Sequence, residues 1–239
     1  MPALEGTVAV VTGATRGLGR AIAEAFVAAG ALTVLVARPG PRLDEVAATL
    51  GADGGAVEVE ACDLGQPAAI ESSCAAIRAR HAVVDTLVNN AGVPAPRSFD
   101  GTAREDWDQV VGVNLAAPFY VTRSLWPALI ASRRPYVINV SGVAGKRGSP
   151  SPAYASSKFG LAGLTHAIGA SATSSGVRST VLYPGSMDTG WRDAPIGVKP
   201  SEEIIDPRVM ASFIVFLVNT PQAFVVNEAV INPIGQPWS

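Results

Sequence analysis

The chain has 239 residues, of which 48% are hydrophobic, with a mean hydropathy of +0.29 and a formal net charge of −2. This length suits one large α/β domain over residues 1–239, and the charge argues against a nucleic-acid partner. Because no apolar run reaches the ~18 residues that a membrane span needs, and residues 1–6 lack the basic start of a secretory signal, we expect a cytoplasmic protein with no membrane partner.

Strand-like and helix-like stretches alternate along the whole chain. A continuous apolar run predicts a buried parallel strand at residues 7–12, and further strands are predicted at residues 32–37, 56–61, 85–88, 135–140, 178–183 and 228–231. Helices are predicted at residues 17–30, 42–50, 67–80, 102–132 and 153–175, with one more inside 201–219. Pro118 and Pro127 should kink or break the helix at 102–132. Repeated β-α units indicate a doubly wound parallel sheet with helices on both faces.

The first predicted strand ends in a glycine-rich turn, Thr12-Gly13-Ala-Thr-Arg16-Gly17-Leu-Gly19. Glycines at a strand-to-helix junction allow a tight turn and let a pyrophosphate approach the backbone at the helix N-terminus. The spacing is Gly-x3-Gly-x-Gly, and no Gly-Lys-Ser/Thr follows, which argues against an ATPase phosphate loop. We therefore favour a dinucleotide-binding turn over a purely structural one.

The end of the second predicted strand bears on the choice of dinucleotide. In NAD-binding folds an acid at this position holds the ribose 2′-hydroxyl. This chain has Arg38 there, and its first acid is Asp44, inside the next predicted helix. A guanidinium without a neighbouring acid suits a 2′-phosphate, and Arg16 can reach the same group. We predict NADP(H) in preference to NAD(H), the alternative being two solvated arginines.

The carboxyl ends of the other strands gather further candidates, because ligands of such sheets bind at this rim. Asp63-Leu64 follows the third strand, where Asp63 either holds the adenine edge or only forms a turn. The stretch from Asn89 to Gly92 follows the fourth strand and is expected beside the cofactor. Ser141 ends the fifth strand, and residues 184–189 follow the sixth.

Tyr154 and Lys158 stand at positions i and i+4, so they share one face of the predicted helix 153–175. A cationic amine beside a phenol stabilises the phenolate and lowers the pKa of the tyrosine. A tyrosine tuned in this way exchanges protons with an alcohol or carbonyl near neutral pH. Alone the spacing is a weak signal, but Ser141 is expected at the same rim.

Together these motifs resemble the short-chain dehydrogenase/reductase family in its compact, single-domain branch. TGATRGLG, NNAG, Asn114 in VNLAAPF, INVS, YASSK and PGSMDT occur in the family's order over nearly the whole chain. The resemblance implies a Rossmann-like, doubly wound, mostly seven-stranded parallel sheet. It also implies an oxidoreductase that interconverts a small-molecule carbonyl and a secondary alcohol with NADP(H).

The resemblance implies a catalytic set of Asn114, Ser141, Tyr154 and Lys158. Tyr154 would be the general acid/base, Lys158 would bind the nicotinamide ribose, Ser141 would hold the substrate oxygen and Asn114 would anchor a water chain. The motifs and the resemblance together give the cofactor-binding set: Gly13, Thr15, Arg16, Gly17, Leu18, Gly19, Arg38, Asp63, Leu64, Asn90, Ala91, Gly92, Tyr154, Lys158, Pro184, Gly185, Met187 and Thr189.

Two alternatives to a general carbonyl reductase stay open. Four cations expected in loops at the rim could attract an anionic acyl carrier, which keeps reduction of a 3-oxoacyl thioester in view: Arg97, Lys146, Arg147 and Arg192. A non-catalytic NADP-binding regulator or subunit is the other alternative.

The remaining expectations concern metals, histidines and assembly. The only cysteines, Cys62 and Cys74, have no metal-binding spacing, so no metal is expected. His81 and His166 are expected to be ordinary surface or packing residues. The resemblance implies a homodimer or homotetramer, in which the apolar positions of helix 153–175 line either the interface or the core: Phe159, Leu161, Leu164 and Ile168.

Overall fold

The computed structural model describes residues 3–52, 54–190, 196–198 and 202–236. Its strands form one parallel sheet of seven strands in the order β3-β2-β1-β4-β5-β6-β7. The strands are β1 (Val8–Thr12), β2 (Leu32–Ala37), β3 (Val57–Ala61), β4 (Thr86–Asn89), β5 (Tyr136–Val140), β6 (Arg178–Pro184) and β7 (Glu228–Ile231). The predicted Rossmann-like α/β sheet is confirmed, and its strand order reverses between β1 and β4, where such sheets bind ligands.

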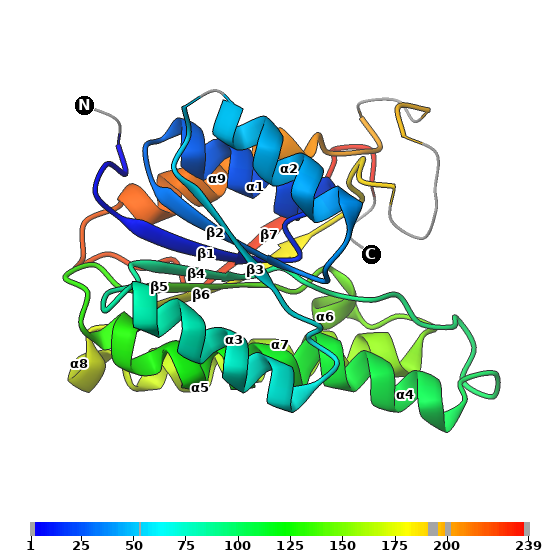
Figure 1. Cartoon of the computed structure of the whole chain (residues 1–239). Helices are drawn as coiled ribbons and strands as arrows, with labels where there is room; N and C mark the ends of the chain where they lie inside the picture. Colours follow the sequence, from blue (N-terminus) through cyan, green and yellow to red (C-terminus); the bar gives the residue numbers. More distant parts are fainter. Residues whose placement is uncertain (1–2, 53, 191–195, 199–201, 237–239) are drawn as a thin grey trace.

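Helices cover both faces of the sheet (Figure 1). One face carries α1 (Gly17–Ala28), α2 (Pro41–Ala52) and α9 (Pro207–Asn219), and the other carries α3 (Pro67–Arg80), α4 (Arg104–Val111), α5 (Ala117–Ile130), α7 (Pro152–Ala170) and α8 (Ala172–Ser175). Neighbouring strand residues face opposite layers: Val10 packs into the core with α3 and α5, and Val11 packs into the core with α1 and α9. This double burial explains why central strands such as β1 and β2 are apolar at most positions, whereas the edge strand β3 alternates valine with glutamate.

The long predicted helix at 102–132 is irregular on one side of Pro118 and continuous at Pro127. A π-helical turn, η1 (Gly112–Ala116), separates α4 from α5. This turn lies directly before Pro118 and contains Asn114, the residue four positions earlier whose carbonyl a proline at 118 cannot bond. The helix α5 continues past Pro127, so the prediction of a break at that proline was wrong. Single π turns inside helices are frequent at functional sites.

The predicted helix 153–175 was too long. The helix α7 ends at Ala170, and the short helix α8 follows it. The Ser171 hydroxyl donates to the Ile168 carbonyl over 2.7 Å, a local side-chain bond that competes with the helical ladder. A further short helix, α6 (Ala144–Arg147), follows β5 and was not predicted.

Candidate active site

The glycine turn after β1 is packed too closely for any side chain. Gly13 and Gly17 adopt φ values of 69° and 52°, in the left-handed region that favours glycine. A Cβ on Gly13 would lie 2.9 Å from the Cα of Ala91, and one on Gly19 would overlap the Gly13 carbonyl oxygen. The glycines thus let neighbouring backbone segments pack closely at the N-terminus of α1, where a pyrophosphate can be bound.

Thr12 fixes the loop after β4 to this turn. Its hydroxyl accepts hydrogen bonds from the backbone N–H groups of Asn90, over 3.0 Å, and Ala91, over 3.1 Å. The Asn90 amide nitrogen donates in return to the Thr12 carbonyl over 3.0 Å. The sequence analysis did not single out Thr12 as a site residue. Its position directly before the first glycine, at the end of a strand, was the signal available.

Tyr154, Lys158 and Ser141 lie together at the carboxyl end of β5. Lys158 is buried, its ammonium nitrogen donates to the Val140 carbonyl over 2.9 Å, and it lies 5.7 Å from the centre of the Tyr154 ring. Burial lowers the pKa of Lys158 to about 8, so the amine still carries its charge at neutral pH. The Tyr154 hydroxyl lies 3.7 Å from the point where a Cβ on Gly142 would stand. Ser141 Oγ donates to the Lys158 carbonyl over 3.0 Å.

Asn114 connects three parts of this site from the π-helical turn. It is fully buried; its Oδ1 accepts from the Val93 N–H over 2.8 Å, and its Nδ2 donates to the Val93 carbonyl over 3.1 Å. Nδ2 also donates to Ser157 Oγ over 3.4 Å, and that hydroxyl donates to the Tyr154 carbonyl over 2.8 Å. Asn114 therefore braces the loop after β4 against the helix that carries Tyr154. Its anchoring of a water chain stays a prediction.

The segment after β6 folds back onto the glycine turn. A Cβ on Gly17 would lie 2.8 Å from Thr189 Cβ, so these two predicted cofactor residues are in direct contact. Arg16, also predicted to bind the cofactor, donates to the Gly190 carbonyl over 3.4 Å. Met187 forms an isolated parallel bridge with Ile205, which holds the segment beside the sheet.

Two predicted cofactor residues, Arg38 and Asp63, follow the strands β2 and β3. Arg38 is exposed just beyond β2. Asp63 Oδ1 accepts from the Gly65 N–H over 3.0 Å, which gives it a turn role, and contact with an adenine stays a prediction. The remaining members lie as predicted by their motifs, in the glycine turn, at the strand ends or in the first turn of α1: Thr15, Leu18, Leu64, Gly92, Pro184 and Gly185.

The expected cationic rim is only partly present. Lys146 and Arg147 belong to the helix α6 rather than to a loop, and Lys146 forms an ion pair with Glu228. The expectation that Lys146 and Arg147 lie in a loop was therefore wrong, and the Glu228 carboxylate offsets the charge of Lys146. Arg97 is exposed, and Arg192 lies outside the described residues.

Gly145 in α6 is a site residue that the sequence analysis missed. A Cβ at this position would lie 2.6 Å from the Lys158 carbonyl oxygen and would overlap Ser141 Oγ. A side chain there would displace the serine hydroxyl, so close packing of α6 requires glycine. No sequence signal marked it, because the short helix itself was not predicted.

The two histidines and Cys74 lie in surroundings that give them a structural role. His81 and His166 each contact a glutamate, Glu58 over 3.0 Å and Glu228 over 2.8 Å. Cys74 is buried in the core, where burial raises the pKa of its thiol to about 12. Within the described ranges, no cluster of three or more histidine, cysteine, aspartate or glutamate residues is placed to hold a metal, and no helix is long and apolar enough to cross a membrane.

The chain matches a known family of proteins. The family model for short chain dehydrogenases matches residues 7–195. The 3-oxoacyl-[acyl-carrier-protein] reductase FabG of Escherichia coli strain K12 is 30% identical over 233 residues, which cover 94% of each chain.

Solved structures agree with this placement. A metagenomic short-chain oxidoreductase in complex with NADP is 35% identical, with a TM-score of 0.84, covering 97% of this chain and 99% of its own. An alcohol dehydrogenase from the archaeon Thermococcus sibiricus, complexed with 5-hydroxy-NADP, is 26% identical, with a TM-score of 0.89 and coverage of 97% and 98%. The chain therefore belongs to the short-chain dehydrogenase/reductase family of NAD(P)-dependent oxidoreductases.

Proposed function

We propose that this oxidoreductase interconverts a carbonyl compound and a secondary alcohol, with Tyr154 as general acid/base. The observation that carries the proposal is the meeting of Tyr154, Lys158 and Ser141 at the end of β5, beside a glycine turn with no room for side chains. A proton donor, a cation and a hydroxyl in one place are the groups that carbonyl reduction needs.

The residues present fit a dinucleotide, because the glycines of the turn let its backbone pack closely against the loop after β4 and the segment after β6, at the N-terminus of α1 where a pyrophosphate can be bound. Residues 13–19 would hold its pyrophosphate, and Lys158 its nicotinamide ribose. The chemistry that bound NADPH supplies is hydride for the carbonyl carbon. Asn90 and Thr189 lie against the glycine turn, where they would confine the cofactor.

The chain's own residues would handle the proton and the charge. Tyr154 Oη donates a proton to the carbonyl oxygen in reduction and accepts it in alcohol oxidation. The buried Lys158 ammonium lowers the energy of the resulting phenolate, an effect that low surrounding polarity strengthens. Ser141 Oγ, which donates to the Lys158 carbonyl here, would turn its hydrogen bond toward the substrate oxygen.

Arg38 supports NADPH as the preferred cofactor. It is exposed beyond β2, and among the described residues no carboxylate pairs with it. The two solved relatives carry NADP or 5-hydroxy-NADP.

Arg38→Ala is expected to lower the preference for NADPH, measured as kcat/KM with NADPH divided by kcat/KM with NADH, by about 10- to 100-fold. This factor corresponds to the free energy of one charge-assisted hydrogen bond. Steady-state kinetics with both cofactors measures this ratio. Arg104→Ala, which removes an exposed arginine of α4, is the control and should leave the ratio unchanged. An unchanged ratio in Arg38→Ala would show that Arg38 does not select the phosphate.

A 3-oxoacyl thioester is the second candidate substrate class, because the E. coli relative named above reduces 3-oxoacyl groups on an acyl-carrier protein. The pairing of Lys146 with Glu228 removes one charge from the cationic rim and weakens this candidate, whereas the exposed Arg97 keeps a cation available. We rank general ketones and 3-oxo esters ahead of carrier-bound acyl groups on this ground.

NADPH oxidation against a panel of ketones, quinones, 3-oxo esters and thioesters tests the function directly. We expect turnover with at least one class, and higher kcat/KM for carrier-bound thioesters than for small 3-oxo esters would select the second candidate. Cofactor binding without turnover on any member would favour the regulator or subunit alternative.

The chain is also proposed to form a homodimer or homotetramer. Leu161 and Ile168 are buried in the core, but Phe159 is 48% exposed on α7, and Phe119 is 45% exposed on the adjacent α5. Exposed aromatic residues of this kind are enriched in protein interfaces. Light scattering after size exclusion tests this, and a monomer would refute it.

A further inference from the structure

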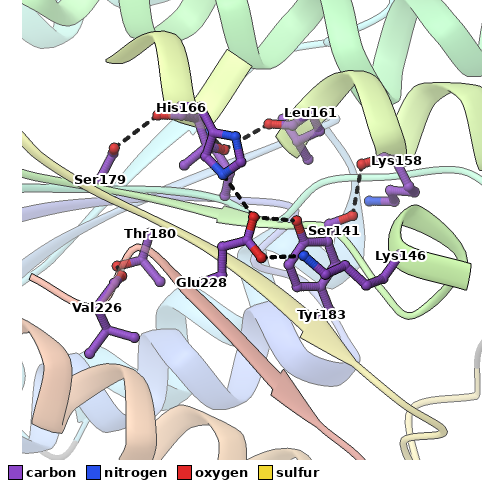
Figure 2. A network of polar contacts seen from close by, with 12 residues as sticks. Ser141, Lys146, Lys158, Leu161, His166, Ser179, Thr180, Tyr183, Val226 and Glu228 are labelled. Atoms are coloured by element: carbon purple, nitrogen blue, oxygen red, sulfur yellow. Dashed lines mark hydrogen bonds and ion pairs between the residues drawn. The ribbon is translucent and has the colours of Figure 1, made fainter. Parts of the chain in front are cut away.

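Glu228, the first residue of the edge strand β7, gathers polar groups from three other elements (Figure 2). Its carboxylate forms an ion pair with Lys146 of α6, and His166 of α7 lies 2.8 Å from Oε1. The Tyr183 hydroxyl of β6 donates to the same oxygen over 3.4 Å. The Lys146 ammonium also lies over the Tyr183 ring, 5.1 Å from its centre. One carboxylate thus joins two helices to two strands.

Glu228 and Tyr183 each keep one protonation state near neutral pH. The hydrogen bond from Lys146 is the largest cause that holds the pKa of Glu228 below its usual value, with His166 acting in the same direction. Burial, together with the Glu228 charge, raises the pKa of Tyr183 to about 12, so the phenol keeps its proton and acts as a donor. Glu228 is therefore an ionised acceptor over the range in which enzymes are assayed.

The helix that Glu228 anchors is the one that packs against the proposed catalytic serine. Gly145 of α6 packs closely against both Ser141 Oγ and the Lys158 carbonyl, because a Cβ built at position 145 would overlap with them. The helix α6 has only four residues, too few to be stable without tertiary support. Its own backbone bonds are few: the N–H groups of residues 145, 146 and 147 donate to Gly142 and Val143.

We propose that Glu228 is a positioning residue, whose carboxylate holds Lys146 and thereby keeps α6 seated against Ser141 and the Lys158 backbone. The edge strand β7 then sets the geometry of the substrate-oxygen site, although Glu228 itself touches neither substrate nor cofactor. The catalytic part of this inference rests on the proposed function, whereas the seating of α6 does not.

The chain offers a closely matched control at the opposite edge of the sheet. Glu58 of β3 pairs with Arg80 over 2.9 Å and with His81 over 3.0 Å, and its side chain is 31% exposed, against 29% for Glu228. Glu58→Gln and Glu228→Gln therefore each remove a carboxylate that joins one cation and one histidine. They differ in whether α6 is involved.

Amide hydrogen exchange tests the seating of α6 without any assay of turnover. In Glu228→Gln, exchange of the amides of residues 145–147 is expected to rise at least about tenfold over the wild type, because α6 opens locally. Glu58→Gln should leave these amides unchanged, even if both variants lose the same global stability. Unchanged exchange in Glu228→Gln would overturn the proposal.

Kinetics then test whether the seating matters for chemistry. With a reducible 3-oxo ester or ketone, kcat of Glu228→Gln is expected to fall about 3- to 10-fold, while the Kd of NADPH stays within twofold. Lys146→Met should show the same loss, and the double variant should be no worse than either single one, because both remove one interaction. Additive losses, or a loss equally large in Glu58→Gln, would overturn the catalytic part. If the wild type reduces no carbonyl, the proposed function fails while the exchange result still decides the seating of α6.

Discussion

Replacement of Tyr154 by Phe is expected to lower kcat at least about 1000-fold, because it removes the hydroxyl proposed to supply the proton to the substrate oxygen. Ser141 is a hydroxyl of ordinary acidity whose proton is donated to the Lys158 carbonyl, and Lys158 donates to the Val140 carbonyl. The Kd of NADPH should change by less than about threefold, since the ring itself remains. Single-turnover reduction and fluorescence titration of NADPH measure the two quantities.

Tyr120→Phe is the matched control for this change. Tyr120 lies on the outer face of α5, is 37% exposed and packs edge-on against Phe119, a contact that loss of the hydroxyl leaves intact. The Tyr120→Phe variant should retain the kcat of the wild type. Retention of more than about a tenth of wild-type kcat in Tyr154→Phe would refute Tyr154 as the proton donor.

Replacement of Lys158 by Met is expected to abolish turnover and to change the pH dependence of stability. The pKa of Lys158 is lowered from 10.5 to about 8 in the folded chain, with burial as the cause. Below pH 8 both the folded and unfolded chains carry the charged amine, and the folded chain bears the full cost of burying it. Between pH 8 and 10.5 the unfolded chain binds more protons, so the wild type gains stability as pH rises.

The gain relative to Lys158→Met should amount to about 2–3 kcal/mol between pH 7.5 and 10. Urea unfolding of both proteins at each pH measures it. If the difference in unfolding free energy between wild type and variant stays constant with pH, then the amine is not desolvated in the folded chain.

The sequence determined the sheet and the places of its strands, because burial on both faces makes the central strands β1 and β2 largely apolar and the strands alternate with helix-like stretches. It also determined the glycine turn and the pairing of Tyr154 with Lys158, since both depend on local geometry: a tight strand-to-helix turn and one face of a helix. Arg38 could be placed because it lies directly beyond a strand.

Only the tertiary structure decided how these pieces are held. Pro118 signalled an irregular helix near Asn114, but neither it nor any other local feature showed that the π-helical turn would bury this side chain. Glu228 and Lys146 are far apart in the sequence, and parallel pairing of β7 with β6 brings them together. The need for glycine at position 145 arises from contact with Ser141 and Lys158. Each of these features depends on contacts between distant segments, and no local propensity or periodicity records which segments meet.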